Sequence, residues 1–316
     1  MPVKLLVTFN AADEDMARLR AISDDLIVER SEGREDAIER ARDAEIVFAG
    51  HFSDALWKNA PRLKWAQSGG AGIERFMTPD FIASPIVLTN AAGVYAVPIA
   101  DHVMAFVMHF CRGFNRMARN QIGRHWSHDT EPDELMDKTI GIVGLGGIGT
   151  EVARRAKAFG MRVIATRRRP ELPSEFADEV RGADDLHWLL GESDYVALCS
   201  ALTQNTHKLI GEEELKKMKP AAYIINIGRG DLIDEPALIV ALKAGTIAGA
   251  GLDVFAEEPL STDSPLWDMP QVLVTPHASG SSPRSHARLM DLFRENVRRY
   301  MSGEPLLNVV DKGEGY

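Results

Sequence analysis

The chain has 316 residues, enough for two domains, and its 45% hydrophobic and 26% charged residues argue against wholesale disorder. Its 36 Lys and Arg against 46 Asp and Glu give a formal net charge of −10. That charge argues against a nucleic-acid partner, because phosphate binding requires a basic face. An anionic substrate would therefore need a local positive site.

The cysteines and the longest apolar run predict a cytoplasmic protein with no membrane segment. Only Cys111 and Cys199 occur, both in apolar runs, which predicts a reducing compartment and no disulfide framework. The longest apolar run, "AVPIADHVMAFVMHFC", is interrupted by Asp101 and two histidines. It is too short and too polar to span a bilayer.

Short apolar strands alternate with helical patterns along the whole chain, which is typical of parallel α/β architecture. The first strands are "KLLVTF", "EIVFAG", "LKWAQS" and "IVLTN", and a long apolar helix follows from about Val97 to Arg112. The second set is "TIGIVG", "RVIATR", "DYVALC", "AYIINI", "AGAGLDVF" and "VLVTP", followed by an amphipathic helix in "SPRSHARLMDLFRENVRRYMSG". The simplest arrangement is a discontinuous substrate domain at residues 1–96 and 284–316, with a nucleotide domain inserted at residues 97–283.

A glycine-rich loop opens the second set of strands. "TIGIVGLGGIGTEVARRAKAFG" reads as a strand, then Gly144, Gly146 and Gly149, then a helix. In a dinucleotide-binding fold the first glycine permits a tight turn, the second lets the backbone approach the pyrophosphate, and the third permits close packing of helix on strand. The helix N-terminus offers free N–H groups to phosphate. The alternative is a structural turn in an unrelated α/β protein.

The next strand ends in "VIATRRRP", where an NAD-binding fold places an acidic residue for the ribose, about 20 residues after the glycine loop. Arg167 occupies that place, and a carboxylate there would repel a 2′-phosphate that guanidinium groups can bind. We therefore expect Thr166, Arg167 and Arg168 to favour NADP(H) over NAD(H). The alternative is a solvated charge run, and the role of Arg169 is left undecided.

Three further strands end in polar residues, at the edge where open α/β sheets bind ligands. "IINIGRGDLIDE" carries Arg229, "AGLDVFAEEPL" carries Asp253 and Glu258, and "VLVTPHASG" carries His277. Packing does not explain an arginine, a glutamate and a histidine at successive strand ends, since each is costly to hold near the interior without a partner.

These segments, with "GIVGLGGIG" and "SGGAGIERF", resemble the D-isomer-specific 2-hydroxyacid dehydrogenase family over nearly the whole chain. The resemblance implies two Rossmann-like α/β domains: a discontinuous, flavodoxin-like substrate domain and an inserted dinucleotide-binding domain, with an interdomain cleft. It implies a homodimer built on the nucleotide domain. It also implies reduction of a small anionic 2-keto acid, such as glyoxylate, hydroxypyruvate or pyruvate, to the D-2-hydroxy acid.

Carried over residue by residue, the resemblance implies a catalytic group of Arg229, Glu258 and His277. Arg229 would bind the substrate's carboxylate and carbonyl oxygen, and His277 would protonate that oxygen as hydride arrives from nicotinamide C4. Glu258 would hydrogen-bond to His277, because a nearby carboxylate favours the protonated ring. Backbone N–H groups of Ala71 and Gly72 would hold the substrate carboxylate, although "SGGAG" alone reads equally as a strand-to-helix turn.

The resemblance implies a larger set of residues around the cofactor. They are Gly144, Gly146, Gly147, Ile148, Gly149, Thr166, Arg167, Arg168, Leu202, Ile227, Gly228, Arg229, Asp253 and His277. Asp253 would contact the nicotinamide carboxamide, although alone it could be a helix cap. Trp267 could line the substrate pocket or pack in the core. No metal is expected, since His125 and His128 have no nearby cysteine and lie in a loop.

Two other functions are consistent with the same motifs. Formate or phosphite oxidation is a second chemistry on this fold, but formate enzymes are expected to carry an amide where Glu258 stands. A nucleotide-sensing, corepressor-like interaction protein is the alternative outside catalysis. The presence of Arg229, Glu258 and His277 favours an enzyme without excluding a regulatory use.

Overall fold

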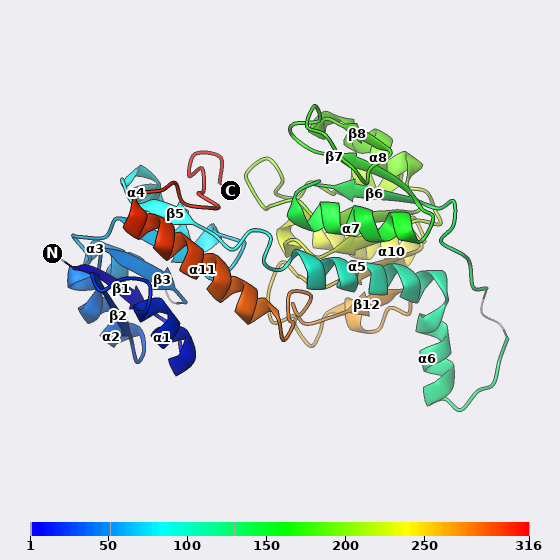
Figure 1. Ribbon diagram of the computed structural model, residues 1–316. Helices are drawn as coiled ribbons and strands as arrows, with labels where there is room; N and C mark the ends of the chain where they lie inside the picture. Colours follow the sequence, from blue (N-terminus) through cyan, green and yellow to red (C-terminus); the bar gives the residue numbers. More distant parts are fainter. Residues whose placement is uncertain (1, 51, 129–130, 316) are drawn as a thin grey trace. The chain divides into compact units, whose positions relative to one another are not determined.

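Parallel β-strands form two separate sheets in the computed structural model, which describes residues 2–50, 52–128 and 131–315 (Figure 1). The chain divides into unit 1, Met1–Tyr95 with Ser282–Tyr316, and unit 2, Ala96–Ser281. The predicted fold class of two parallel-sheet α/β domains is confirmed.

Unit 1 has the strand order β2-β1-β3-β4-β5, which is the flavodoxin-like order. Its strands are β1 (Val3–Val7), β2 (Leu26–Arg30), β3 (Ile46–Ala49), β4 (Trp65–Ser68) and β5 (Val87–Thr89). Its helices are α1 (Asp13–Arg20), α2 (Arg34–Arg40), α3 (Asp54–Lys58), α4 (Pro79–Ala83) and α11 (Ser285–Ser302), with short 3-10 turns at Ala41–Asp43 and Glu74–Phe76.

Helix α11 comes from the far end of the sequence and packs on the sheet formed by the first 95 residues (Figure 1). The ring centroid of Phe293 lies 3.9 Å from that of Phe48 and 5.6 Å from that of Trp65. All three side chains are fully buried. Large aromatic side chains contribute much of the apolar area of a core, so α11 completes the core of unit 1.

Unit 2 has the strand order β12-β11-β10-β9-β6-β7-β8, and every strand pair is parallel. The strands are β6 (Thr139–Val143), β7 (Arg162–Thr166), β8 (Glu179–Arg181), β9 (Tyr195–Leu198), β10 (Tyr223–Asn226), β11 (Gly249–Leu252) and β12 (Val272–Val274). The helices are α5 (Ala96–Cys111), α6 (Phe114–Ile122), α7 (Gly147–Ala158), α8 (Leu186–Glu192), α9 (Glu212–Lys217) and α10 (Glu235–Ala244), with 3-10 turns at Ala183–Asp185, Gly230–Leu232 and Pro265–Trp267. The order reverses between β6 and β9, and open α/β sheets bind ligands at such a switch point.

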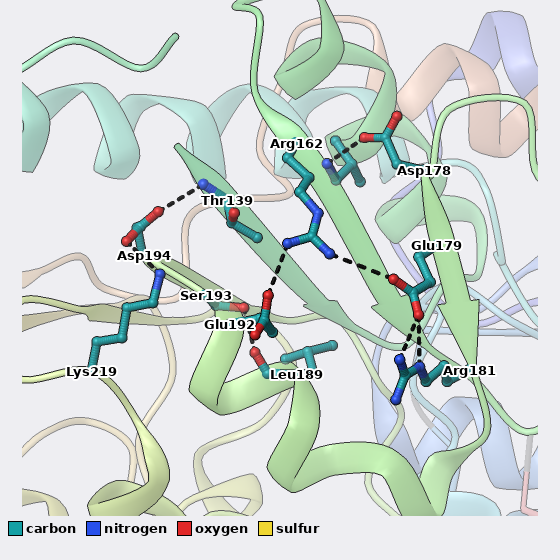
Figure 2. Close-up of polar contacts among 11 residues, drawn as sticks. Thr139, Arg162, Asp178, Glu179, Arg181, Leu189, Glu192, Ser193, Asp194 and Lys219 are labelled. Atoms are coloured by element: carbon teal, nitrogen blue, oxygen red, sulfur yellow. Dashed lines mark hydrogen bonds and ion pairs between the residues drawn. The ribbon is translucent and has the colours of Figure 1, made fainter. Parts of the chain in front are cut away.

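Charged side chains link the amino ends of several strands of unit 2 (Figure 2). Asp194, just before β9, accepts a hydrogen bond of 2.8 Å from the backbone N–H of Thr139, the first residue of β6. Arg162, the first residue of β7, pairs with Glu192 at 2.9 Å and with Glu179 of β8 at 3.5 Å. These contacts link the amino ends of β6, β7, β8 and β9. They all lie at one edge of the sheet, so the opposite, carboxyl edge is left for a ligand.

Helices α5 and α7 lie side by side on unit 2 (Figure 1), and Arg155 of α7 donates a 2.6 Å hydrogen bond to Asp101 of α5. Helix α5 also lies close to β11: a Cβ on Gly251 would be only 2.8 Å from the ring of Phe106, so a glycine at this position permits the close approach. None of the helices in the described residues is long and apolar enough to cross a membrane.

Candidate active site

The glycine turn after β6 has the geometry that a dinucleotide requires. Gly144 has φ +97°, and a Cβ there would lie 2.7 Å from the backbone nitrogen of Ser200. A Cβ on Gly149 would lie 2.2 Å from the carbonyl oxygen of Gly144, so only glycine lets α7 start this close to the turn. A Cβ on Gly146, in contrast, would meet no atom of the described residues within 4 Å. The open space therefore lies at the second glycine, where the backbone N–H groups of Gly147 and Ile148 begin α7.

Two buried polar atoms next to this turn have no hydrogen-bond partner within the described residues: Ser200 Oγ, in the loop after β9, and Arg167 Nε, after β7. Buried polar groups are nearly always satisfied, so Ser200 Oγ at the switch point and Arg167 Nε beside it are available to a polar ligand; Ser31 Oγ and Arg288 Nη1, in unit 1, are also without a partner in the described part of the chain. Together with the open cradle at Gly146, Ser200 and Arg167 show that the residues fit a dinucleotide.

The residues after β7 divide into a buried and an exposed set. Thr166 is buried, and its carbonyl oxygen accepts a 2.9 Å hydrogen bond from the N–H of Gly144. Arg167 is half-buried, and its guanidinium donates hydrogen bonds to the backbone oxygens of Leu172 and Pro173. Arg168 and Arg169 are exposed. The arginine run therefore combines one guanidinium that organises its own loop with two that face the surface.

A buried amide holds the turn that carries Arg229. Asn226, at the end of β10, donates a 2.8 Å hydrogen bond to the carbonyl oxygen of Arg229 and accepts one of 3.1 Å from the N–H of Gly228. Arg229 Nη1 in turn donates to the carbonyl oxygen of Gly228 at 2.7 Å. Because Asn226 is only 1% exposed, its side chain acts as a fixed internal clamp on this turn.

The structure brings Glu258 and His277 into direct contact. Glu258 Oε2 lies 2.7 Å from His277 Nδ1, and Glu258 Oε1 accepts a 3.0 Å hydrogen bond from the N–H of Phe255. A Cβ on Gly230, next to Arg229, would lie 1.8 Å from the carbonyl carbon of Phe255. Gly230 therefore allows the arginine turn to pack directly on the segment that orients Glu258, so three strand ends meet at one place.

Asp253 is completely buried at the end of β11, and its carboxylate binds the segment that carries His277. Its oxygens accept hydrogen bonds from the N–H groups of Ala278 at 2.8 Å and Ser279 at 2.9 Å, and from the hydroxyl of Thr275 at 2.6 Å. Its carbonyl oxygen accepts a bond of 2.8 Å from the N–H of His277. Asp253 therefore organises this loop and does not cap a helix.

The glycine-rich loop of unit 1 turns its carbonyl groups toward its own unit. The carbonyl oxygen of Gly69 accepts a 2.6 Å hydrogen bond from the hydroxyl of Tyr95, and that of Ala71 accepts one of 3.0 Å from the amide of Asn90. Burial raises the pKa of Tyr95, which keeps the hydroxyl a donor. The carbonyl groups of Gly69 and Ala71 are therefore engaged within unit 1 itself.

Other predicted residues occupy less informative positions. Ile227 is buried, Leu202 is half-buried, and Trp267 is 51% exposed, so Trp267 is not a core residue. Burial raises the pKa of the Cys199 thiol to about 12, which makes it a poor nucleophile at neutral pH. Within the described residues, no three His, Cys, Asp or Glu side chains form a group that could hold a metal ion.

Sequence reasoning missed Asn226, Ser200, Thr275 and His102, which all lie near the predicted site. Asn226 is the last residue of β10, and Ser200 and Thr275 come just after β9 and β12. Their position at the carboxyl ends of strands was the sequence signal that could have identified them. His102 lies on α5, and its ring nitrogen Nε2 is 3.0 Å from Thr275 Oγ1. No local pattern in the sequence relates these two residues, because they are 173 positions apart.

Known proteins with similar sequences are dehydrogenases and reductases. The family model described as D-isomer specific 2-hydroxyacid dehydrogenase, NAD binding domain, matches residues 104–279. Glyoxylate/hydroxypyruvate reductase B of Pectobacterium carotovorum subsp. carotovorum (strain PC1) is 38% identical to this chain over 271 residues, which cover 84% of each protein.

Solved structures show the same similarity over the full length. An NADPH-dependent glyoxylate/hydroxypyruvate reductase from Sinorhizobium meliloti, in complex with NADP and sulfate, has a TM-score of 0.87 and 28% identity, covering 99% of this chain and 100% of that one. A D-isomer specific 2-hydroxyacid dehydrogenase from Xanthobacter autotrophicus Py2, in complex with NADPH and MES, has a TM-score of 0.85 and 30% identity, covering 99% of both chains.

One added methyl group should have different effects at two glycines: at Gly146, just before α7, it should weaken cofactor binding, and at Gly149, in the first turn of α7, it should destabilise the fold. Gly146→Ala fills open space, so we expect the melting temperature to change by less than about 3 °C and the Kd for NADPH to rise about tenfold or more. Gly149→Ala collides with backbone and should destabilise the fold by about 1–3 kcal/mol. Thermal denaturation and fluorescence titration with NADPH measure both effects. Unchanged NADPH binding by Gly146→Ala would contradict the assignment of the cradle.

Proposed function

Since the chain belongs to the D-isomer specific 2-hydroxyacid dehydrogenase family, we propose that it uses NADPH to reduce a small 2-keto acid to the D-2-hydroxy acid. Glyoxylate, hydroxypyruvate and pyruvate are the candidate substrates. The observation that carries the proposal is the 2.7 Å contact between Glu258 and His277, beside the turn that holds Arg229. The relatives named glyoxylate/hydroxypyruvate reductase support the substrate class.

A bound reduced nicotinamide supplies the hydride that adds to the keto carbon. Arg229 binds the substrate carboxylate and polarises the keto oxygen through charge-assisted hydrogen bonds. Glu258 accepts a hydrogen bond from Nδ1–H of His277, so the protonated ring keeps that proton, presents Nε2–H to the keto oxygen and transfers the Nε2 proton as the negative charge develops. The side chain of His277 is 49% exposed, which lets the ring regain its proton from solvent.

Each unit has its own proposed contribution to binding. In unit 2, Gly144, Gly146, Gly147, Ile148 and Gly149 bind the pyrophosphate, while Leu202, Ile227, Gly228 and Asp253 surround the rest of the cofactor. In unit 1, the N–H groups of Ala71 and Gly72 bind a carboxylate. We propose that residues 1–96 and 284–316, which correspond closely to unit 1, form the substrate domain, and that residues 97–283, which correspond closely to unit 2, form the dinucleotide-binding domain, whose Arg229 and His277 also contact the substrate.

The proposal predicts that His277 is needed for turnover and dispensable for cofactor binding. His277→Gln should lower kcat about 100-fold or more, while the Kd for NADPH stays within about twofold of wild type, since the pyrophosphate cradle is intact. Nicotinamide absorbance, followed with glyoxylate, hydroxypyruvate and pyruvate, measures the first effect.

The wild-type protein separates the remaining alternatives in the same assay. Reduction of NADP by formate or phosphite, with no reduction of keto acids, would support the second chemistry. Tight NADPH binding with no turnover of any of these compounds would support a nucleotide-sensing interaction protein. Either result would overturn the proposed reaction.

We further propose that Arg167 and Arg168, with Thr166, favour NADP(H) over NAD(H). The residues that end this strand are Thr166 and then three arginines, with no carboxylate to repel a phosphate, and the exposed Arg168 carries the charge and the N–H groups that a phosphate requires. Arg167 contributes its buried, unpartnered Nε, while its Nη2 donates to the backbone oxygens of Leu172 and Pro173. Both solved neighbours carry NADP or NADPH, which supports the preference.

Arginine substitutions test the cofactor preference. Arg168→Ala should raise the Kd for NADPH about 10- to 100-fold, the cost of a hydrogen bond to a charged group, and leave the Kd for NADH nearly unchanged. Arg169→Ala in the same assay decides the open role of the third arginine, and Arg18→Ala, an exposed and ion-paired arginine of α1 in unit 1, is the control with no expected effect on either Kd. Equal weakening of NADH and NADPH by Arg168→Ala, or a wild-type kcat/KM that is higher with NADH, would contradict the assignment.

We also propose that the protein is a homodimer formed through unit 2. Helix α6 extends away from the rest of unit 2 (Figure 1), and none of its side chains is buried against the described part of the chain. Phe114 is 48% exposed, Ile122 84%, and Trp126, just after the helix, 92%. Several large apolar side chains exposed within one short segment are a feature of protein interfaces.

Light scattering tests the dimer directly. We expect twice the mass of one chain for the wild type, and a shift toward one chain for Ile122→Glu, because a buried, unpaired carboxylate opposes association. Ile27→Glu, at an exposed position of β2 in unit 1, is the control and should keep the wild-type mass. A wild-type mass of one chain would overturn the proposal.

A further inference from the structure

The hydrogen bonds around Asp253 extend beyond the active-site loop to helix α5. The hydroxyl of Thr275 donates to Asp253 Oδ1 at 2.6 Å, and the Thr275 oxygen is 3.0 Å from Nε2 of His102. A threonine hydroxyl has one proton, and here Asp253 accepts it. The Thr275 oxygen must therefore accept from His102, so Nε2 of His102 carries a proton.

Close packing of α5 on the sheet places His102 at this point. The absence of a side chain on Gly251 lets Phe106 of α5 lie directly on β11. His102, one turn earlier, packs against Phe106 with the two rings nearly perpendicular and their centroids 4.8 Å apart. The imidazole is thereby held 3.9 Å from Asp253 Oδ1, with only 24% of its side chain exposed.

The backbone of the segment held by this network is in an unfavourable conformation. His277 has φ +50°, a left-handed value that is costly for a residue with a side chain and persists only where the surroundings enforce it. The enforcing contacts are the hydrogen bonds that Asp253 accepts from Thr275, Ala278 and Ser279. His102 fixes the Thr275 hydroxyl and thereby supports one of these three bonds.

We propose that His102 is a positioning residue for His277, acting through Thr275 and Asp253. It contacts neither substrate nor cofactor in this role. Its Nε2–H keeps the Thr275 hydroxyl aimed at Asp253, which keeps the 275–279 segment, and with it the imidazole of His277, in place. This inference rests on the proposed function, in which His277 is the proton donor.

Three variants separate positioning from general stability. His102→Leu removes the donor, and His102→Gln retains an N–H at nearly the same reach. His109→Leu makes the same change two turns later on α5, away from the network.

We expect His102→Leu to lower kcat about tenfold, since a misplacement of about 1 Å costs up to about 100-fold. The KM for the keto acid and the Kd for NADPH should stay within about twofold, because the substrate and cofactor contacts are intact. His102→Gln should recover most of kcat, and His109→Leu should retain it.

The inference would be overturned if His102→Leu kept the wild-type kcat, or if His102→Gln lost as much as His102→Leu while KM and Kd rose together. Hydrogen exchange followed by mass spectrometry provides a second measurement that needs no turnover. The amides of residues 277–279 should exchange faster in His102→Leu and at the wild-type rate in His109→Leu. If the wild type reduces no keto acid, the proposed reaction fails while this exchange still decides whether His102 holds the loop; unchanged exchange in His102→Leu would overturn the inference.

Discussion

The arrangement of the site depends on the hydrogen bonds that the fully buried carboxylate of Asp253 accepts. An ionised group without water is costly unless its oxygens are satisfied, and nearly every donor that satisfies Asp253 comes from the segment that follows β12. If residues 275–279 moved away, the carboxylate would be left as a buried charge without hydrogen-bond donors. His277 lies within this segment, and its own N–H donates to the carbonyl oxygen of Asp253, so its position is fixed as well.

Glycines allow the other parts of the site to assemble around this anchor. At Gly230, Gly251 and Gly149 a single Cβ would collide with a neighbouring element, at distances of 1.8, 2.8 and 2.2 Å. Gly230 lets the turn of Arg229 meet the segment of Glu258, and Gly251 lets the Phe106 ring of α5 lie on β11, so segments that are separate in the sequence come together. Gly149 acts locally and lets α7 start close to the turn at Gly144.

Local patterns in the sequence were enough to predict the fold class and to mark the strand ends that carry Arg229, Glu258 and His277. They suffice because a strand, its glycine turn and its polar residue are adjacent in the chain. The partners of these residues could not be found in this way. The contact of His102 with Thr275 depends on how α5 packs over β11, and the hydrogen bonds of Arg167 to Leu172 and Pro173 depend on the conformation of a loop. Both are set by tertiary packing, for which no neighbouring residue gives a signal.

The seating of α11 on unit 1 has a consequence for how the protein is made. Phe293 fills the core between Phe48 and Trp65, yet it is synthesised after the whole of unit 2. During translation, the first 95 residues must therefore wait with an open apolar face while residues 96–281 emerge and can fold as a unit. The order of synthesis and the order of completion therefore differ: unit 1 begins to emerge before unit 2 and is completed after it. The apolar face that α11 later covers is a candidate binding surface for a chaperone during that interval.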